Sequence, residues 1–391
     1  MKIKALEKID QLVEDRKEEI KKARKEGTKV VGYLCCRVPV ELIYAHGMIP
    51  IRVGNAAPTH MASGKEFIHQ FTCPYIKSVV GEFLDETSFY HENIDIITGS
   101  VICLTVSRAL EVLKAYTGKP MFPIHLPQLP PGNEETEYFT REVKWFSQEL
   151  EKQTGKKLDE GKLFESVELY NNIKEDLTKL YETQSKEGSP LTWPQLFRLI
   201  HAGFLLDPQH YQTLLREVIE EIDTLGIQEP TDNRARLMLS GSPVLPMDNL
   251  LIDTIEGAGG RIVTDTLCTG IRTFDGLSIE EPTIEGIAST YLHSCPCSSA
   301  QDPDLEKDRR LDHMLKLIKE NQVDGVVYYC LRFCDPFAFK DDETKAVLAK
   351  KTGTPLLPIH WEYGDSYGSL WTRVEGFMEA METKKDKWRD K

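Results

Sequence analysis

Runs of consecutive apolar residues mark eight segments of this chain as buried strands. Four runs lie in the first third of the chain and four in its last part: 30–34, 49–53, 94–97, 121–124, 237–239, 261–263, 326–329 and 356–359. A strand that is apolar at consecutive positions is buried on both faces, as in a parallel sheet covered by helices. Because segments with helical spacing separate these runs, the sequence predicts an α/β fold with parallel sheets.

Helical spacing of apolar residues dominates the rest of the chain. Ile3, Leu6 and Ile9 begin a charged N-terminal stretch that Gly27 closes, which predicts a surface helix. Residues 135–228 contain no convincing strand run and carry helical stripes rich in Glu and Lys. We therefore expect four parts: an N-terminal helix (1–28), a first Rossmann-like lobe (29–134), a helical insert (135–228) and a second Rossmann-like lobe (229–391).

The two expected lobes share a short phrase. GKPMFPIHL at 118–126 and GTPLLPIHW at 353–361 match as Gly-x-Pro-x-x-Pro-Ile-His. Each phrase follows a helical stretch and precedes a loop, which is where the last strand of a lobe is expected. The match favours two lobes of related topology that the helical segment joins, with a cleft between them.

The charge balance excludes one class of function. The 391 residues include 48 Lys and Arg against 62 Asp and Glu, which gives a formal net charge of −14. A nucleic-acid binder needs a basic face to neutralise phosphates, so we expect no nucleic-acid partner. The N-terminus lacks the apolar region of a signal peptide, and no stretch of about 18 apolar residues is present to span a membrane. We therefore expect a cytoplasmic protein.

Nucleotide-binding motifs are missing from the chain. There is no G-x-x-x-x-G-K-[ST] P-loop, and EGAGGR at 256–261 does not match G-x-G-x-x-G. Nucleotide binding by this chain is therefore unsupported.

The nine cysteines are the candidate chemistry. They are too few for a disulfide scaffold in a chain of this length, so we expect reduced thiols or ligands. Ligands of open α/β sheets bind beyond the carboxyl ends of the strands. All nine cysteines stand at or near such ends or in turns that contain proline: Cys35, Cys36, Cys73, Cys103, Cys268, Cys295, Cys297, Cys330 and Cys334. If the two lobes face each other, these thiols converge on one cleft.

Three explanations compete for these thiols. Cysteine is a small hydrophobe, and any single one of them can be a core residue. A structural zinc site is the second explanation, although the paired CxxC knuckles typical of such sites are missing. Iron–sulfur ligation is the third and favoured explanation, because its thiolates come from widely separated loops around a protected cleft.

Several phrases together resemble the 2-hydroxyacyl-CoA dehydratase and benzoyl-CoA reductase superfamily. They are GYLCCRVPVELIYAHGMIPIRV (32–53), FTCPYIKS (71–78), DTLCTGIR (265–272), HSCPC (293–297), VDGVVYYCLRFCDPF (323–337) and TRVEGFMEAM (372–381). The resemblance covers nearly the whole chain in order. It implies two α/β lobes around an oxygen-sensitive iron–sulfur cluster, which a separate ATP-hydrolysing activator protein charges with a low-potential electron. The missing P-loop fits that division of labour.

The resemblance also implies a set of ligands. Simple dehydratase subunits bind one [4Fe-4S] cluster through three cysteines, which map onto Cys73, Cys103 and Cys334. The double-cubane branch adds the Cys of CTG and both Cys of CxC, three ligands for each cubane of an [8Fe-9S] cluster; these map onto Cys268, Cys295 and Cys297. Both cluster types stay open at this point. Cys35, Cys36 and Cys330 keep the core explanation, with a ligand position as the alternative for Cys330.

The implied function is that of a cluster-bearing enzyme subunit, an iron–sulfur reductase or lyase that transfers single electrons to an acyl-CoA. The subunit would act as a homodimer or with a sister chain. Alternatives are a radical (R)-2-hydroxyacyl-CoA dehydratase with one [4Fe-4S] cluster, a homodimeric double-cubane reductase of small molecules, an electron carrier without a CoA pocket, and a zinc-stabilised binding protein. Glu41 and His46 are the polar residues singled out for catalysis, with helix capping as their competing role.

Overall fold

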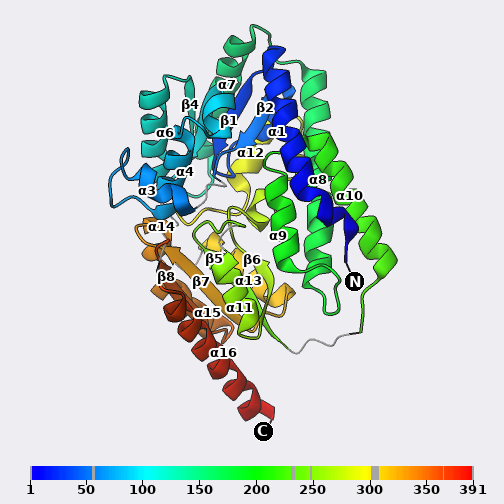
Figure 1. The fold of residues 1–391 in the computed structure, drawn as a ribbon, viewed down its shortest axis with the longest axis vertical. Helices are drawn as coiled ribbons and strands as arrows, with labels where there is room; N and C mark the ends of the chain where they lie inside the picture. The colour runs from blue at the N-terminus through cyan, green and yellow to red at the C-terminus, as the bar shows by residue number, and fades with distance from the viewer. Residues whose placement is uncertain are drawn as a thin grey trace.

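The computed structural model describes residues 2–54, 58–229, 234–246, 249–300, 308–363 and 365–389, without the side chains of residues 249 and 382–389. Two four-stranded sheets follow one another along the long axis of the molecule (Figure 1). Every strand pairing in them is parallel. The prediction of an α/β fold with two parallel sheets is confirmed.

Each of the eight predicted apolar runs overlaps a strand. The first sheet contains β1 (Val30–Leu34), β2 (Ile49–Arg52), β3 (Ile96–Val101) and β4 (Met121–His125). The second sheet contains β5 (Ala235–Gly241), β6 (Gly260–Asp265), β7 (Gly325–Leu331) and β8 (Leu356–Trp361). β1, β6 and β7 are buried at every position, which explains why their residues are apolar without alternation.

The two sheets have the same topology. Their strand orders are β2-β1-β3-β4 and β6-β5-β7-β8, so each strand of one sheet has a counterpart in the other. The two copies of the shared phrase cover β4 and β8, which are edge strands. The prediction that this phrase marks the last strand of each lobe is therefore confirmed.

Helices cover both faces of the first sheet. α4 (Pro74–Leu84) and α6 (Leu104–Thr117) pack on the face that carries Val30, and α2 (Val40–Ala45) and α7 (Asn133–Thr154) pack on the face that carries Val31. Three short helices complete this lobe: η2 (Pro58–His60), α3 (Met61–Gly64) and α5 (Phe89–Asn93).

Helices also cover both faces of the second sheet. α11 (Asn249–Gly257) and α16 (Tyr367–Arg389) lie on one face, and α13 (Arg309–Glu320) and α15 (Asp341–Lys351) lie on the other. The core under α11 and α16 is continuous with the core under α4 and α6. The two lobes therefore share one hydrophobic core instead of touching only at a surface.

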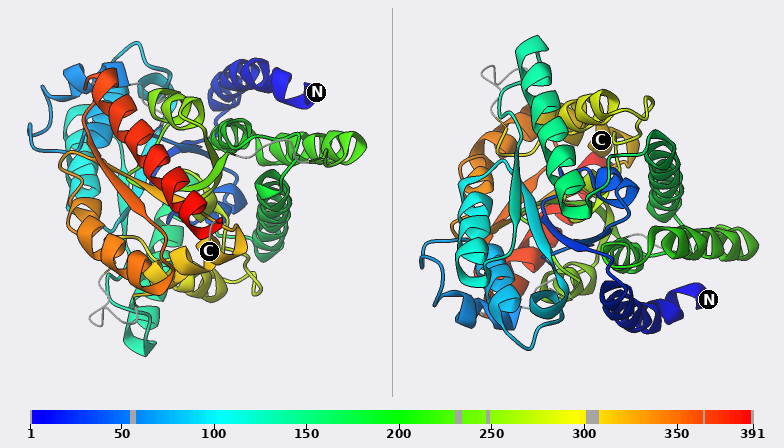
Figure 2. Two further views of the ribbon diagram at one scale, coloured as in Figure 1. Left: turned by 90° about the horizontal axis from the view of Figure 1, so that it is seen from below. Right: turned by 90° about the horizontal axis from the view of Figure 1, so that it is seen from above.

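The remaining helices flank both lobes on one side of the molecule (Figures 1 and 2). They are η1 (Lys4–Lys8), α1 (Ile9–Lys25), α8 (Glu160–Ser185), α9 (Trp193–Ala202) and α10 (Pro208–Leu225). α8 contacts α2 of the first lobe and β6 of the second, so it bridges the two. In the part of the chain that the structure describes, no helix is both long and apolar enough to cross a bilayer.

One segment departs from the expected division of the chain. Residues 277–292, which include most of α12 (Ile284–His293), follow β6 in sequence but pack in the core of the first lobe. Their partners there include Leu42 of α2 and Phe139 of α7. The stretch expected to form only the second lobe thus contributes a helix to the first, and the chain crosses the junction between the lobes at both ends of α12.

Candidate iron–sulfur site at the junction of the lobes

The carboxyl ends of the strands in both sheets face a common junction. β2 ends at Arg52, whose Nη2 donates a hydrogen bond of 2.8 Å to the carbonyl oxygen of Cys268, shortly after β6. The ring of Phe71 in the first lobe lies 5.3 Å from the ring of Phe333 in the second, measured between centroids. Segments that carry cysteines in the two lobes therefore lie against each other, as the strand-end argument predicted.

Three cysteines occupy the same position relative to a helix. Cys73, Cys103 and Cys334, which we call the first triad, are the N-cap residues of α4, α6 and α14 (Asp335–Ala338). Pro74 at the first position of α4 favours a helix start there. The positive end of a helix dipole stabilises a thiolate, which is the form of cysteine that binds metals.

The other three predicted ligands lie in loops of the second half. Cys268, Cys295 and Cys297, the second triad, follow β6 and α12. The buried Asp265 shapes the Cys268 loop, because its Oδ1 accepts hydrogen bonds from the backbone nitrogens of Leu267 (2.9 Å) and Ile271 (3.1 Å). A Cβ at Gly270 would lie 2.3 Å from the same oxygen, which explains glycine in the CTG sequence.

The six thiols converge. Cys334 forms a hydrogen bond with Cys73, and this contact together with burial raises the pKa of Cys334 well above its ordinary value. The Cys297 thiol lies within electrostatic reach of Cys103 and Cys334 in the first triad and of Cys268 in the second. Burial raises the pKa of Cys268 to about 12 and also raises that of Cys103. None of the nine cysteines forms a disulfide bond.

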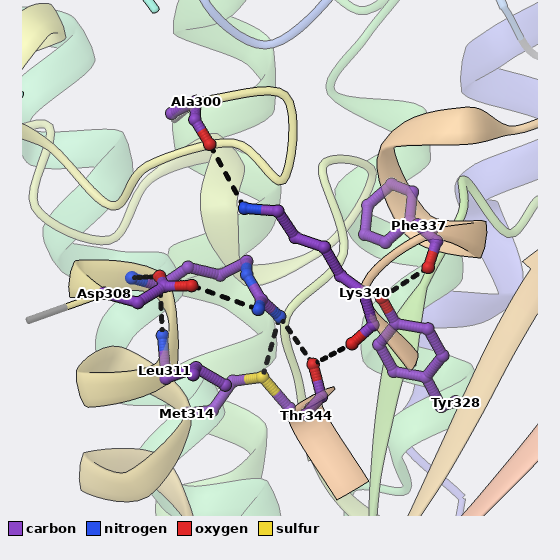
Figure 3. A network of polar contacts seen from close by, with 9 residues as sticks. Ala300, Asp308, Leu311, Met314, Tyr328, Phe337, Lys340 and Thr344 are labelled. Atoms are coloured by element: carbon purple, nitrogen blue, oxygen red, sulfur yellow. Dashed lines mark hydrogen bonds and ion pairs between the residues drawn. The ribbon is translucent and has the colours of Figure 1, made fainter. Parts of the chain in front are cut away.

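A polar network connects the loop after Cys297 with the residues that follow α14, the helix that begins after Cys334 (Figure 3). Lys340 Nζ donates a hydrogen bond of 3.2 Å to the carbonyl oxygen of Ala300, three residues after Cys297. The Thr344 hydroxyl donates to the Lys340 carbonyl oxygen (2.6 Å) and accepts from the guanidinium of Arg310 (3.1 Å). These bonds connect the loop after Cys297 to the residues between α14 and α15.

The vicinal pair Cys35 and Cys36 belongs to this group as well. Both residues follow β1, and Cys35 has a φ of 81°, a conformation that non-glycine residues rarely adopt. A hydrogen bond with Cys35 and the nearby guanidinium of Arg37 lower the pKa of Cys36 well below its ordinary value, although burial opposes them. The sequence analysis assigned this pair to the core, yet its strand-end position was the signal that also located the other thiols.

Three buried arginines surround the second triad. Arg37, Arg52 and Arg272 are each at most 3% exposed. Arg37 donates a hydrogen bond to the hydroxyl of Ser294, the neighbour of Cys295. Within the described part of the chain, none of the three forms an ion pair with a carboxylate, and Nη2 of Arg37 and Nε of Arg272 have no hydrogen-bond partner.

His313 is a further polar residue of the site that the sequence analysis did not find. Its Nε2 lies 2.7 Å from Oδ2 of Asp275. Burial lowers the pKa of His313, but the hydrogen bond with Asp275 and the interaction with the nearby Cys295 thiol outweigh burial and raise this pKa to about 9. Burial raises the pKa of Cys295, while His313 and Arg272 lower it, with a net value below the ordinary one. His313 therefore favours the thiolate form of Cys295.

Cys330 does not join the site as a thiol exposed to the junction. It lies in β7, is fully buried, and packs in the core with Tyr328 and Met314. Burial raises its pKa to about 12. Its surroundings fit the core explanation rather than a ligand position.

The two polar residues singled out for catalysis, Glu41 and His46, lie in different environments. Glu41 is fully buried, with Oε1 2.6 Å from Lys174 Nζ and Oε2 accepting a hydrogen bond of 2.8 Å from the Tyr291 hydroxyl. His46 lies away from the thiols, where its Nε2 is 3.0 Å from the Ser147 hydroxyl and burial lowers its pKa. Glu41 is therefore a buried ion-pair partner, and α2 has no side-chain capping hydrogen bond at its N-terminus.

A small cavity lies between the set of thiols and helices α8, α9 and α10. Its volume is about 80 Å³, and its lining includes Tyr33, Cys36, Arg52, Lys174, Tyr211 and Tyr291. The Tyr211 hydroxyl is buried and has no hydrogen-bond partner among the residues described. Cys36 and Arg52 belong both to this cavity and to the surroundings of the second triad.

The donor set suits an iron–sulfur cluster better than a single ion. In the described ranges, no group of three or more His, Cys, Asp and Glu lies close enough to hold one metal ion. A cluster instead takes thiolates that are spread around a core of several irons. Buried guanidinium groups without carboxylates also need a negative partner nearby, and a thiolate-ligated cluster is anionic. The residues present therefore fit this cofactor.

The fold and the junction define a class of two-lobed α/β proteins with a thiol-rich, cationic site between the lobes. Residues 35–381 match the family model described as 2-hydroxyglutaryl-CoA dehydratase, D-component, and the chain belongs to this family. The resemblance deduced from the sequence phrases is thereby confirmed.

Individual relatives are distant but match most of the chain. A benzoyl-CoA reductase subunit from Thauera aromatica is 22% identical, with 88% of this chain and 87% of the relative covered. The beta subunit of (R)-2-hydroxyglutaryl-CoA dehydratase from Acidaminococcus fermentans is 22% identical, with 97% and 100% covered. The beta subunit of (R)-phenyllactyl-CoA dehydratase from Clostridium sporogenes is 21% identical, with 95% and 96% covered.

Proposed function

We propose that this chain is the iron–sulfur subunit of an ATP-activator-dependent, low-potential enzyme that acts on acyl-CoA thioesters. The observation that carries the proposal is the convergence of six cysteines from both lobes beside three buried arginines without carboxylate partners. The relatives named after reductases and dehydratases of CoA thioesters support the substrate class.

The cysteines would act as ligands. Three in the first triad and three in the second would hold an [8Fe-9S] double cubane, and the first triad alone would hold one [4Fe-4S] cluster. A bound cluster supplies single electrons at low potential. Burial of the junction keeps water from the site, and Arg52 with the Tyr211 hydroxyl can orient a carbonyl oxygen in the cavity beside Cys36.

The proposed partners are an electron donor and a second subunit. No nucleotide motif is present in the chain, so ATP hydrolysis would belong to a separate activator protein. The chain also matches the alpha subunit of (R)-2-hydroxyglutaryl-CoA dehydratase from Acidaminococcus fermentans, with 22% identity over 248 residues. Alpha and beta subunits of that enzyme are thus both related to this chain, which supports assembly from two such subunits, identical or paired with a sister.

A second candidate function is reduction of a small molecule without CoA. The cavity beside Cys36 has a volume of about 80 Å³, which is about half that of an engineered cavity of about 150 Å³ that binds benzene. The basic groove lined by Lys21, Arg24 and Lys25 lies near the amino end of β1, at the opposite edge of the sheet from the thiols. CoA phosphates would find no equivalent groove at the thiol edge among the cavities described.

Anaerobic turnover with both substrate classes tests the proposal. Reconstituted protein, supplied with ATP and an activator-type donor, should consume reducing equivalents when benzoyl-CoA is added, or should release water from 2-hydroxyglutaryl-CoA with no net consumption of reductant. Cys73→Ala should abolish this activity and Cys330→Ala should retain it. Turnover of small molecules alone would favour the second function, and a colourless protein with stoichiometric zinc would contradict both.

A further inference from the structure

We propose that the positive charges of Arg37, Arg52 and Arg272 make the reduction potential at the second triad higher than that at the first. Electrons delivered to the protein would therefore pass from the first triad to the second. The inference rests on the proposed function in its two-cubane form. It concerns the direction of transfer inside the protein, which the ligand set alone does not determine.

Hydrogen bonds hold two of the arginines, Arg37 and Arg52, against the second triad. Arg52 donates to the carbonyl oxygen of Cys268 at 2.8 Å, and its guanidinium lies 4.4 Å from the ring centroid of Phe204. Arg37 donates to the Ser294 hydroxyl, one residue before Cys295. The Arg37 and Arg52 guanidinium groups are thus each hydrogen-bonded to a neutral group and not to a carboxylate.

Arg272 lies closest in sequence to the triad, four residues after Cys268, and is 3% exposed. A guanidinium stays protonated in proteins, so Arg272 carries a full positive charge. The thiols of Cys297 and Cys295 are its strongest electrostatic partners. The nearby carboxylate of Asp275 is bonded to His313 at 2.7 Å, so it is occupied by another partner. Three full positive charges therefore surround the second triad.

The first triad has a different electrostatic environment. Its buried cation, Lys77, is 4.0 Å from Oε1 of Glu362, which reduces the effect of the lysine charge. The helix N-termini at the three cysteines contribute roughly half a charge each at most, and α14 has only four residues. In a buried site these differences are weakly screened, so an added negative charge is more stable at the second triad.

The surroundings of the two triads agree with this direction. Large exposed side chains flank the first triad in sequence: Phe71 (61% exposed), Leu104 (70%) and Phe339 (83%). The cavity instead borders the second triad through Arg52 and Cys36. Each transfer would move one electron, which oxidises the first cluster and reduces the second by one unit, and no bond or proton need move.

Potentiometric EPR titration of Arg272→Gln tests the inference. We expect unchanged iron content and about a tenfold decrease in the equilibrium constant for reducing the second cluster, which is about 59 mV for a one-electron couple. Arg272→Lys keeps the charge and should restore most of the potential. Arg108→Gln, the same change at a 60% exposed side chain on α6, is the matched control and should leave both potentials unchanged.

Two further variants complete the test. Arg37→Gln gives a second measurement if Arg272→Gln fails to fold, because Arg37 is bonded to the Ser294 side chain, whereas Arg52 is bonded to the backbone of the Cys268 loop. Cys268→Ala identifies which EPR signal belongs to the second triad. The inference would be overturned if Arg272→Gln and Arg37→Gln both kept the wild-type reduction potentials. It would also be overturned if the first cluster of the wild type were reduced before the second. A wild-type chain without iron would instead contradict the proposed function itself.

Discussion

The ion pair between Glu41 and Lys174 joins three separate parts of the chain. Glu41 lies on α2, Lys174 on α8 and Tyr291 on α12, and the Lys174 ammonium also donates to the carbonyl oxygen of Leu277 at 2.7 Å. All three side chains are buried, and Lys174 and Tyr291 also line the cavity. The pair therefore fixes the bridging helix and the crossing segment to the first lobe.

Breaking this pair should be costly. Glu41→Gln leaves a buried ammonium without its counter-charge, and we expect a loss of about 3–5 kcal/mol in the free energy of unfolding. Lys174→Met in the same chain should recover part of that loss, because the unpaired charge is then removed. Denaturant unfolding of the two single variants and the double variant measures this coupling. Strictly additive losses would show that the two side chains do not act as a pair.

Glu82 on α4 should make stability depend on pH. Burial raises the pKa of Glu82 from 4.5 to about 7, and its Oε2 has no hydrogen-bond partner in the described structure. The pKa of Glu82 is higher in the folded state than in the unfolded chain. The contribution of Glu82 to the free energy of unfolding is therefore fully present below about pH 4.5 and is lost as the pH rises through about 7. The loss should be on the order of 2 kcal/mol.

Glu82→Gln tests this pH dependence. Its free energy of unfolding should change less than that of the wild type between pH 4.5 and pH 8, and it should be the more stable of the two at pH 8. The comparison uses denaturant unfolding at both pH values. Parallel profiles of the two proteins would contradict a raised pKa for Glu82.

At the scale of elements, α3 and α4 approach each other through two glycines. A Cβ at Gly81 would lie 2.1 Å from the carbonyl oxygen of His60, and one at Gly64 would lie 1.9 Å from that of Lys77. Both obstacles are backbone atoms, which cannot rotate away as a side chain can. This contact positions α4, whose N-cap is Cys73 of the first triad.

Gly81→Ala should therefore affect both stability and the site. We expect a loss of about 1–3 kcal/mol from overpacking and a lower iron content, because α4 must move away from α3. Gly376→Ala on α16 is the control, since no heavy atom lies within 4 Å of its Cβ position. This control should be up to about 1 kcal/mol more stable. Equal iron content in the two variants would show that the helix contact does not position Cys73.

The elements themselves could be predicted from the sequence because burial on both faces leaves a strong pattern. All eight strands overlap apolar runs, and the shared phrase marks β4 and β8, the last strand of each lobe along the chain. Side-chain partners could not be predicted in the same way. The pairing of Glu41 with Lys174 connects residues 133 positions apart, and no local pattern encodes such a contact.

At the scale of the whole molecule, the crossing of the chain was the feature that sequence patterns missed. α12 has the apolar spacing of any buried helix, and this spacing does not say which lobe buries it. The strand-end argument depends only on parallel topology. It could predict the loop positions after the strands, as for Cys268, but it could not separate them from a core position such as that of Cys330. The arginines were missed because a single Arg in a strand or loop has no periodicity that distinguishes a buried position from an exposed one.

The central claim is that two thiol triads at the junction each hold iron. The most direct test is the quantitation of iron and sulfide per chain in anaerobically prepared wild type and Cys268→Ala, with Cys330→Ala as a control at a core cysteine. Two cubanes predict about eight irons in the wild type, about four in Cys268→Ala and an unchanged content in Cys330→Ala. About four irons in all three proteins would contradict a second cluster and leave Cys73, Cys103 and Cys334 as the whole site.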